Sequence, residues 1–503
     1  MSFYILITMV ITLFAKLFGF AREIVLSYYF GASQISDAYL ISLTIPGTIF
    51  QFVGTGLATS YIPIYLKAKS SKDEDKGEEF TNTITTVILI FATIMTIFVW
   101  TLGDRIVLLF ASGFSGETLH YATLFTKINI SSLYLATFVY VFSSYLQANE
   151  KVLAVQLSVI PYSLTMLASI ALAAKVNVII LPIGSIIASG VQLITLLAFV
   201  IRLRFKFRFS FNYKTKEFEN FCKILVPVII GVSINDINVL VDRTMASNIA
   251  TGAISALTYS YSLTMFIQGV FVQPITNVYY PKIAKANVEH NTEAFAEYIN
   301  EGVLGILFFL VPISAYCLTS SSNVINLLYG RGAFNSEAIR LTSKAFFGYA
   351  LSFIGVGARE FLSRIFYALR NTKIPTVNAG IGGIINVVLN IILSRIFGIY
   401  GLAMATSVSA IVTSLLLYYS LYRMNIYRLS VSFYVQLVKI IIAAALMSTT
   451  IICLRFFVLI SINAIIAFLL EFFVGVLVYF AICMMFGISI VSVLLEGIKK
   501  RYL

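Results

Sequence analysis

Apolar stretches long enough to cross a lipid bilayer recur along the whole chain of 503 residues. A membrane-spanning helix needs about 20 mostly apolar residues, and the hydropathy pattern predicts about fourteen such helices. Only 11% of the residues are charged, whereas a soluble domain typically carries about 25%. The pattern therefore predicts an all-α polytopic membrane protein, which leaves no room for a sizeable soluble domain.

The formal net charge of +13 is unevenly distributed, and its distribution predicts the topology. The even-numbered connections between the predicted helices, together with the C-terminal tail, hold 21 Lys and Arg residues, and the odd-numbered connections hold 6. Because cytoplasmic loops of membrane proteins carry the excess of basic residues, both termini are predicted to be cytoplasmic. The excess positive charge then sets the orientation of the helices in the membrane, and no nucleic acid is expected as a partner.

Four pairs of similar segments recur in the same order, at offsets of 217 to 222 residues. They are "REIVLSYYFGA" and "RTMASNIATGA", "YIPIYLKAK" and "YYPKIAKA", "YLQANEK" and "YALRNTK", and "IGSIIAS" and "YGLAMATS". The repeat predicts two pseudo-symmetric six-helix lobes, at residues 1–210 and 211–425, followed by two appended helices and a cytoplasmic tail at 426–503. Parallel repeats of this kind are typical of transporters whose halves rock around a central cavity.

Three charged residues lie in the first predicted helix and one opens the second: Lys16, Arg22, Glu23 and Asp37. A charge at the bilayer centre costs at least about 2.5 kcal/mol, so such residues usually face a bundle interior or a watery cavity. One interpretation places Lys16 and Arg22 in the wall of a cavity for an anionic group, with Asp37 orienting one of them. The alternative places Arg22 at a membrane interface and makes Asp37 a cap of its own helix. Asp37 has no acidic counterpart in the second half, where Thr258 occupies the aligned position.

A polar stripe marks the seventh predicted helix, where Asn235, Asn238 and Asp242 recur at helical spacing and Asp236 lies on an adjacent face. The eleventh and twelfth predicted helices add three more oxygen-bearing side chains: Asn386, Asn390 and Thr406. Oxygen ligands suit a hard cation such as Na⁺, and a carboxylate could equally carry a proton. Hydrogen bonding between helices is the structural alternative.

The sequence does not favour an enzyme. Its two histidines, His120 and His290, fall at loops or helix ends, so the membrane region offers no histidine-based metal site or general base. A membrane glycosyltransferase or acyltransferase would also need a nucleotide or acyl-CoA site, which no motif here indicates.

Five segments together carry a resemblance to known proteins: "GFAREIVLSYYFGASQISDAYL", "VDRTMASNIATGAISALTYS", "LLYGRGAFNSEAIRLTS", "FYALRNTKIPTVNAG" and "GLAMATS". They resemble the MurJ (MviN) family of bacterial flippases for lipid-linked cell-wall precursors, within the multidrug, oligosaccharidyl-lipid and polysaccharide exporter superfamily. The resemblance implies a fourteen-helix protein of the bacterial cytoplasmic membrane. It also implies export of a polyprenyl-diphosphate-linked saccharide such as lipid II by alternating access. Membrane lipids and other cell-wall synthesis proteins are the further partners that it implies.

The resemblance also assigns site residues. Cavity arginines of the family match Lys16 and Arg22, and an acid at the start of its second helix matches Asp37. A sodium site of the family, with the ion in a coupling or structural role, falls on Asp242 or Asp236, on Asn386, Asn390 and Thr406, and on a backbone carbonyl near Leu402. No other cofactor is implied.

Two positions depart from the family pattern. Phe50 and Gln51 stand where the second helix usually has arginine, and Ser262 replaces an arginine of the eighth helix. Gln51 and Ser262 thereby complete the predicted substrate-binding set. A less cationic cavity leaves open another lipid-linked saccharide, such as a capsule, O-antigen or teichoic-type repeat unit. A non-transporting scaffold of the same fold is a further alternative.

Overall fold

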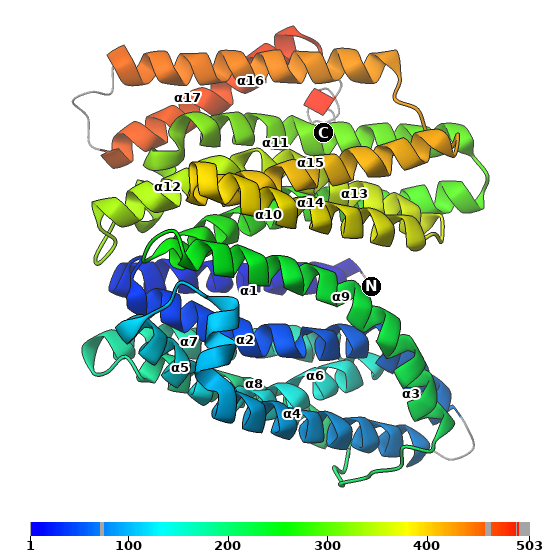
Figure 1. Ribbon diagram of the computed structural model, residues 1–503. Helices are drawn as coiled ribbons and strands as arrows, with labels where there is room; N and C mark the ends of the chain where they lie inside the picture. The colour runs from blue at the N-terminus through cyan, green and yellow to red at the C-terminus, as the bar shows by residue number, and fades with distance from the viewer. Residues whose placement is uncertain (1, 71–74, 458–463, 489, 492–503) are drawn as a thin grey trace. The chain divides into compact units, whose positions relative to one another are not determined.

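The computed structural model describes residues 2–70, 75–457, 464–488 and 490–491, which form helices and short connections without a β-strand. The helices are α1 (Ser2–Phe30), α2 (Gln34–Gly56), the π-helical turn η1 (Leu57–Tyr61), α3 (Ile62–Lys69), α4 (Asp75–Phe110), α5 (Gly116–Asn129), α6 (Ser132–Ala148), α7 (Val152–Lys175), α8 (Ile180–Arg202), α9 (Lys216–Ser247), α10 (Ala253–Val288), α11 (Thr292–Tyr329), α12 (Ser336–Ala350), α13 (Ser352–Ala368), α14 (Lys373–Phe397), α15 (Ile399–Arg423), α16 (Val431–Phe457) and α17 (Ala464–Met485) (Figure 1).

Nine helical segments in the described ranges are long and apolar enough to cross a membrane, and two bent pairs of shorter helices raise the number to eleven. The pairs are α5 with α6 and α12 with α13, which bend by 46° and 44°. Helices α1, α9 and α10 are also long, and α9 carries Asp236, Asp242 and Arg243 within its second half. The predicted all-helical membrane fold is confirmed, whereas the count of fourteen spans stays a prediction.

The helices that follow residue 215 repeat the order and the breaks of the preceding series. Helices α4 and α11 each contain one residue outside helical geometry, Leu102 and Ser320. The bent pair α5 and α6 recurs as α12 and α13, and glycines at positive φ, Gly31 and Gly252, precede α2 and α10. These correspondences match the duplicated six-helix plan, after which α16 and α17 follow as additional helices.

By its internal contacts the chain forms two compact units, one of residues 1–255 with 332–334 and the other of residues 256–331 with 335–503. In the first unit α2 packs against α5 and α9, and α1 packs against α7. In the second unit α15 packs against α12, α13 and α14. The predicted lobes end at residues 210 and 425, and these limits come from the sequence repeat. The contacts do not test the limits, which stay predictions.

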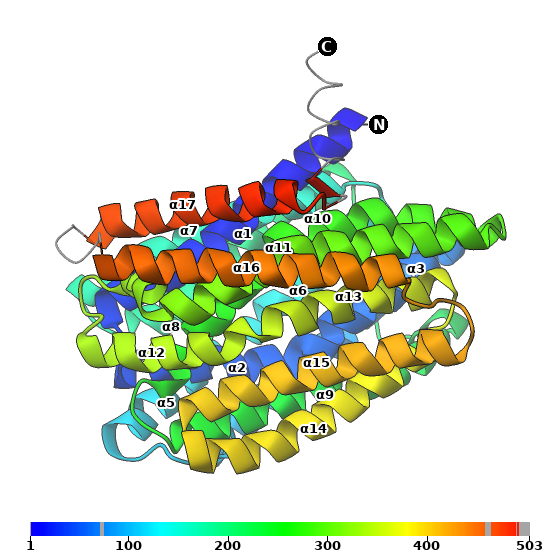
Figure 2. The ribbon, with the colours of Figure 1, turned by 90° about the horizontal axis from the view of Figure 1, so that it is seen from above.

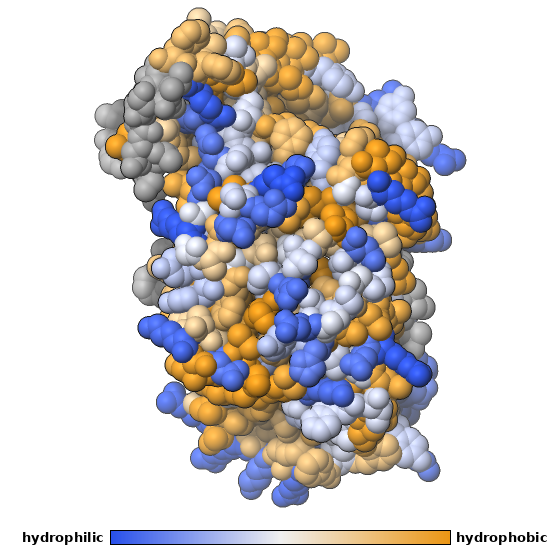
Figure 3. All heavy atoms as spheres, turned by 60° about the vertical axis from the view of Figure 1, so that its left-hand side comes forward, coloured by the Kyte–Doolittle hydropathy of each residue, from blue (hydrophilic) through white to orange (hydrophobic). Residues whose placement is uncertain are grey.

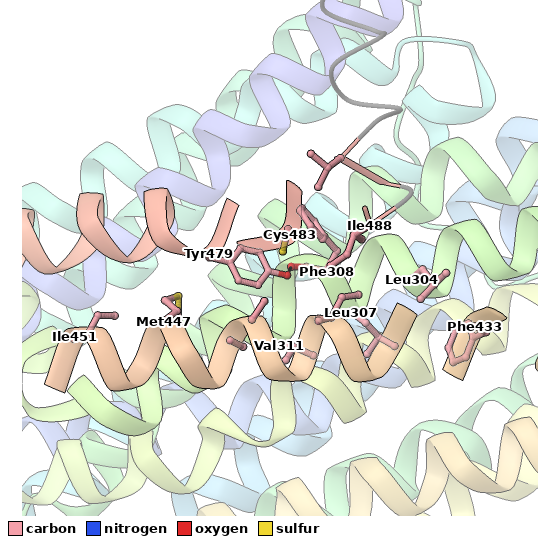
Figure 4. Close-up of a cluster of buried hydrophobic side chains, with 14 residues drawn as sticks. Leu304, Leu307, Phe308, Val311, Phe433, Met447, Ile451, Tyr479, Cys483 and Ile488 are labelled. Carbon is pink, nitrogen blue, oxygen red and sulfur yellow. Dashed lines mark hydrogen bonds between the residues drawn. The ribbon is translucent and has the colours of Figure 1, made fainter. Parts of the chain in front are cut away.

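Within the second unit, helices α16 and α17 lie alongside α11 (Figure 2). An apolar cluster joins the three helices and contains Leu307, Phe308 and Val311 of α11, Met447 and Ile451 of α16, and Tyr479 and Cys483 of α17 (Figure 4). Many other large apolar side chains are exposed. Figure 3 shows broad hydrophobic areas between groups of hydrophilic side chains on one face, as expected for a helical protein with lipid as its solvent.

Candidate functional site

Asp37 lies in the first turn of α2 and joins it to the start of α10. Ser33 caps α2 in a capping box with Ser36, which fixes the first turn of the helix. The Asp37 carboxylate is 1% exposed. Its Oδ2 accepts the backbone N–H of Gly252 at 2.7 Å, and its Oδ1 accepts the N–H of Ser255 at 2.8 Å and the Ser255 hydroxyl at 2.5 Å. Asp37 therefore satisfies N–H groups that the start of α10 would otherwise leave without partners.

The described contacts of Asp37 differ from both interpretations of the sequence. Its hydrogen bonds lead to α10, neither to Lys16 or Arg22 nor to the start of its own helix. The Arg243 guanidinium, the repeat counterpart of Arg22, lies within electrostatic range of Asp37 and donates to the Ile254 carbonyl oxygen at 3.1 Å. The carboxylate thus connects the start of α2 to the start of α10, a connection that we call the joint. The sequence pattern did not predict these hydrogen-bond partners.

Three of the five segments that carry the family resemblance meet at this joint. Gly31 has φ +64° and Gly252 has φ +83°, conformations that glycine adopts without strain. A Cβ atom at Gly252 would overlap the carbonyl oxygen of Ala32, and one at Gly31 would overlap the carbonyl oxygen of Ala333. The Ala333 N–H donates to the Tyr28 carbonyl oxygen at 2.8 Å. The glycines therefore permit a close approach of three chain segments.

Arg22 pairs with its neighbour Glu23 on α1. The Arg22 Nη2 donates to Glu23 Oε1 at 2.7 Å, and the two side chains are 31% and 4% exposed. Tyr39 and Tyr162 lie within electrostatic range of the guanidinium. The hydrogen bond to Glu23 uses one of the five N–H donors of an arginine. A half-exposed guanidinium beside a buried carboxylate is thus held in place with donor capacity for a further anion.

The remaining predicted substrate residues occupy different settings. Lys16 is half-buried on α1, and Gln51 is exposed on α2. Phe50 is 1% exposed and stacks on Phe91 and Tyr140, with ring centroids 6.1 and 6.5 Å away. Ser262 is half-buried on α10, in the second unit. Of these two neighbouring positions on α2, Gln51 is therefore the one whose side chain is exposed and polar.

Three members of the predicted cation set cluster in the second unit. Asn390 Nδ2 donates to Asn386 Oδ1 at 3.1 Å, and Asn386 Nδ2 lies 3.4 Å from Thr406 Oγ1. The Thr406 hydroxyl in turn donates to the Leu402 carbonyl oxygen at 3.4 Å. Asn386 and Asn390 are 6% and 0% exposed. The cluster therefore brings amide, hydroxyl and carbonyl oxygens together inside a helix pair, and this neutral donor set suits a hard monovalent cation.

The acids of that set lie on α9, in the first unit. Asp236 and Asp242 are both half-buried, and the side chain of Asn235 lies outside the described residues. Among the residues that the structure describes, no group of three or more His, Cys, Asp and Glu side chains could hold a metal ion. The described residues therefore show no cluster rich in acids or histidines that would hold a cation by itself.

A buried ion pair that the sequence analysis did not single out connects α16 and α17. Arg455 Nε and Nη2 donate to the two oxygens of Glu471 at 3.0 and 2.8 Å. Arg455 also donates to the Thr319 carbonyl oxygen at 3.1 Å and to the Ser320 hydroxyl at 2.8 Å. One acid and one arginine in adjoining apolar stretches are the signal that could have found it.

Comparisons with known proteins agree on one family. The chain matches the family model described as "Lipid II flippase MurJ" over residues 26–473. It is 25% identical over 440 residues to a probable lipid II flippase MurJ of Vibrio cholerae, covering 84% of this chain and 83% of that protein. It is 25% identical over 410 residues to the lipid II flippase MurJ of Thermosipho africanus, covering 81% and 83% of the two chains.

Solved structures show the same fold. The structure of a lipid II flippase MurJ in an inward closed conformation matches with a TM-score of 0.85 at 24% identity, and the match covers 97% of this chain and 100% of that one. An inward-facing multidrug resistance transporter of the MATE family matches with a TM-score of 0.70 at 14% identity, covering 82% of this chain and 94% of that one. With a family match that extends over most of its length, this multi-pass helical membrane protein belongs to the lipid II flippase MurJ family.

Proposed function

We propose that this chain moves a polyprenyl-diphosphate-linked cell-wall precursor of the lipid II type across the bacterial cytoplasmic membrane, by alternating access of its two halves. The observation that carries the proposal is the family match over residues 26–473. A duplicated six-helix plan suits such a cycle. The protein acts as a transporter and not as an enzyme, with both termini in the cytoplasm, an orientation that the distribution of Lys and Arg supports.

The diphosphate of the precursor would bind to Arg22. Arginine binds phosphate through paired N–H donors, and Arg22 is half-exposed and oriented by buried Glu23. Lys16, six residues earlier on α1 and half-buried, would add a second positive charge. Both residues precede the stretch that the family model matches. Gln51 and Ser262 would provide neutral hydrogen bonds to the headgroup. Asp37 would act indirectly, by holding the starts of α2 and α10 together.

Sodium is proposed as a coupling or structural ion. Asn386, Asn390 and Thr406, with the Leu402 carbonyl, would supply its oxygen ligands, and these residues are already connected by hydrogen bonds. Asp242 or Asp236 on α9 would supply a carboxylate in the predicted set. A bound cation would lower the cost of the polar groups buried between α14 and α15.

A second candidate is the export of another lipid-linked saccharide, such as a capsule, O-antigen or teichoic-type repeat unit. The observation that favours it is on α2, where Phe50 is packed between aromatic rings and Gln51 is the exposed polar side chain. An uncharged side chain there lowers the positive charge available to the diphosphate.

The test is to express the full chain in cells depleted of their own lipid II flippase, and to measure how much labelled lipid II reaches the outer face. Outward transport and rescued growth are expected. Transport of a different lipid-linked saccharide, but not of lipid II, would favour the second candidate. A chain that binds the precursor without moving either substrate would be a scaffold, and the proposal would be wrong.

A further inference from the structure

The connection between α8 and α9 forms an extended segment that alternates basic and aromatic residues. Residues 202–214 read "RLRFKFRFSFNYK", and residues 205–212 have no helical or turn structure. We call residues 203–214 the strap. Such an alternation in an extended chain sends successive side chains to opposite faces.

Hydrogen bonds fix the strap against α4. The Asn82 side chain donates to the Lys206 carbonyl oxygen at 3.3 Å and accepts the Arg208 N–H at 3.1 Å. The Ser210 N–H donates to the Thr86 hydroxyl oxygen at 3.2 Å. Asn82 and Thr86 are 5% and 8% exposed. The strap therefore covers a polar strip of α4 and has a defined position.

Aromatic side chains fix the inner face of the strap against α6. The ring of Phe205 lies 4.9 Å from that of Tyr145 and 5.8 Å from that of Phe142. The ring of Phe207 lies 5.4 Å from that of Phe138. Phe205 is 9% exposed. Alternate residues are thus anchored, and the residues between them must point outward.

The outer face carries positive charge, and the aromatic residues that follow Phe205 and Phe207 on the other face are exposed as well. Arg204, Lys206 and Arg208 are exposed, and Phe209 and Phe211 are 78% and 58% exposed. Large exposed aromatic side chains are costly in water but favoured at the boundary between lipid headgroups and acyl chains. Lysine and arginine at the same level would contact phosphate groups. Charge and ring placement together match an anionic lipid surface.

An open groove of about 680 Å³ lies at the connection between α6 and α7, and Phe199 of α8 forms part of its wall. Lys151, Val152, Leu157 and Phe199 are among its lining residues, and the Arg202 guanidinium lies 5.8 Å from the centre of the Phe199 ring. The groove is mostly apolar and is lined by one basic and one acidic side chain, Lys151 and Glu150, and the Arg202 guanidinium lies next to its Phe199 wall.

We propose that the strap and this groove bind an anionic phospholipid of the cytoplasmic leaflet. The proposal depends on the proposed orientation of the termini and not on the transported substrate. The corresponding connection in the second half, residues 424–430, is shorter and reads "MNIYRLS", with one basic residue. A general need for positive cytoplasmic loops does not explain that difference, whereas a lipid site confined to the first unit does.

The test uses the single tryptophan of the chain. Trp100 is replaced by Phe and Phe209 by Trp, so that the only indole lies on the strap. The full chain is reconstituted in vesicles that contain brominated phosphatidylglycerol or brominated phosphatidylcholine in equal amounts. Quenching by the phosphatidylglycerol should be several-fold stronger, and the preference should fall at high salt because it is electrostatic. Equal quenching by both lipids would overturn the proposal.

A second experiment removes positive charges from the strap. In the same background, Lys206→Gln with Arg208→Gln should weaken apparent binding of phosphatidylglycerol roughly tenfold to thirtyfold, given the usual contribution of each basic residue near an anionic surface. The matched control is Arg370→Gln with Lys373→Gln, two exposed basic residues of the second half, which should leave the preference unchanged. An equal loss in both double variants would show a general effect of net charge and overturn the site.

Discussion

The carboxylate of Asp37 holds Ser255, which lies 218 residues further along the chain, through two hydrogen bonds of 2.8 and 2.5 Å. The contact links the first turn of α2 to the first turn of α10, and these two helices occupy equivalent places in the repeat. It also accounts for an asymmetry of the sequence. Position 258, which aligns with Asp37, is a threonine, and the start of α10 receives its carboxylate from α2.

Replacing Asp37 by Ala should lower stability more than it lowers transport per folded molecule. The variant leaves the N–H groups of Gly252 and Ser255 buried without their acceptor, at a cost of about 2 to 3 kcal/mol for hydrogen bonds to a charged group. Thermal unfolding of the purified chain in detergent measures the loss. Asp37→Asn keeps one acceptor oxygen, so its stability should lie between that of the wild type and that of Asp37→Ala. A fully stable Asp37→Ala that cannot transport would instead assign Asp37 to the substrate.

Glycine-to-alanine changes at this joint should follow the local geometry. Gly252→Ala places a Cβ against the Ala32 carbonyl oxygen at a positive φ, so it should destabilise the chain by at least about 1 to 2 kcal/mol. Gly19 on α1 has open space at its Cβ position, and Gly19→Ala should stabilise its helix by about 0.5 to 1 kcal/mol. Unfolding midpoints of the two variants provide the comparison. Equal shifts would refute the role given to Gly252.

Sequence patterns predicted the helical membrane fold, the repeat and the family because these depend on local composition and order. They predicted Asn386 and Asn390 on one helix face, since residues four apart share a face, and Thr406 on the next helix. The structure has these residues on α14 and α15, and their role as cation ligands stays a prediction. The sequence patterns did not predict the partners of Asp37 or of Glu23. Glu23 shares a helical face with Lys16 seven residues earlier, yet it pairs with the adjacent Arg22. These partners depend on side-chain conformation and on which distant segment packs beside each residue. A local sequence pattern contains neither kind of information.

Removing Arg22 alone should damage folding as well as transport. Arg22→Ala leaves the Glu23 carboxylate buried without its ion-pair partner, and the loss of one partner of a buried pair costs about 3 to 5 kcal/mol. The double variant Arg22→Ala with Glu23→Ala should recover most of the folded protein in the membrane. Its outward transport of labelled lipid II should still fall at least about tenfold, because the proposed diphosphate ligand is missing.

Arg22→Lys is the matched control, since it keeps the charge but loses the planar fork. It should retain intermediate transport. Normal transport by the double variant would remove Arg22 from the proposed substrate site while leaving the stability result intact.

Sodium should stabilise the wild-type chain against heat relative to potassium. A ligand at 100 times its dissociation constant stabilises the folded state by about 2.7 kcal/mol. Asn386→Ala should abolish most of this difference between the salts, because it removes an oxygen from the α14 and α15 cluster. Asn378→Ala is the control, a buried asparagine two turns earlier on α14, and it should keep the sodium response. An identical response in all three proteins would exclude the cation site.

The buried pair of Arg455 and Glu471 should behave as one unit. Glu471 is 1% exposed, so Arg455→Leu leaves a buried carboxylate without its ion-pair partner and should cost about 3 to 5 kcal/mol. Arg455→Leu with Glu471→Leu removes both charges and should restore stability to within about 1 kcal/mol of the wild type, since well-packed apolar residues often replace a buried pair at little cost. Thermal unfolding of Arg455→Leu, Glu471→Leu and the double variant gives the coupling energy. Because Arg455 also bonds Thr319 and Ser320 at the break in α11, a double variant that is stable but transports poorly would show that the appended helices control that break. Additive losses in the double variant would mean instead that the two side chains stabilise α16 and α17 independently.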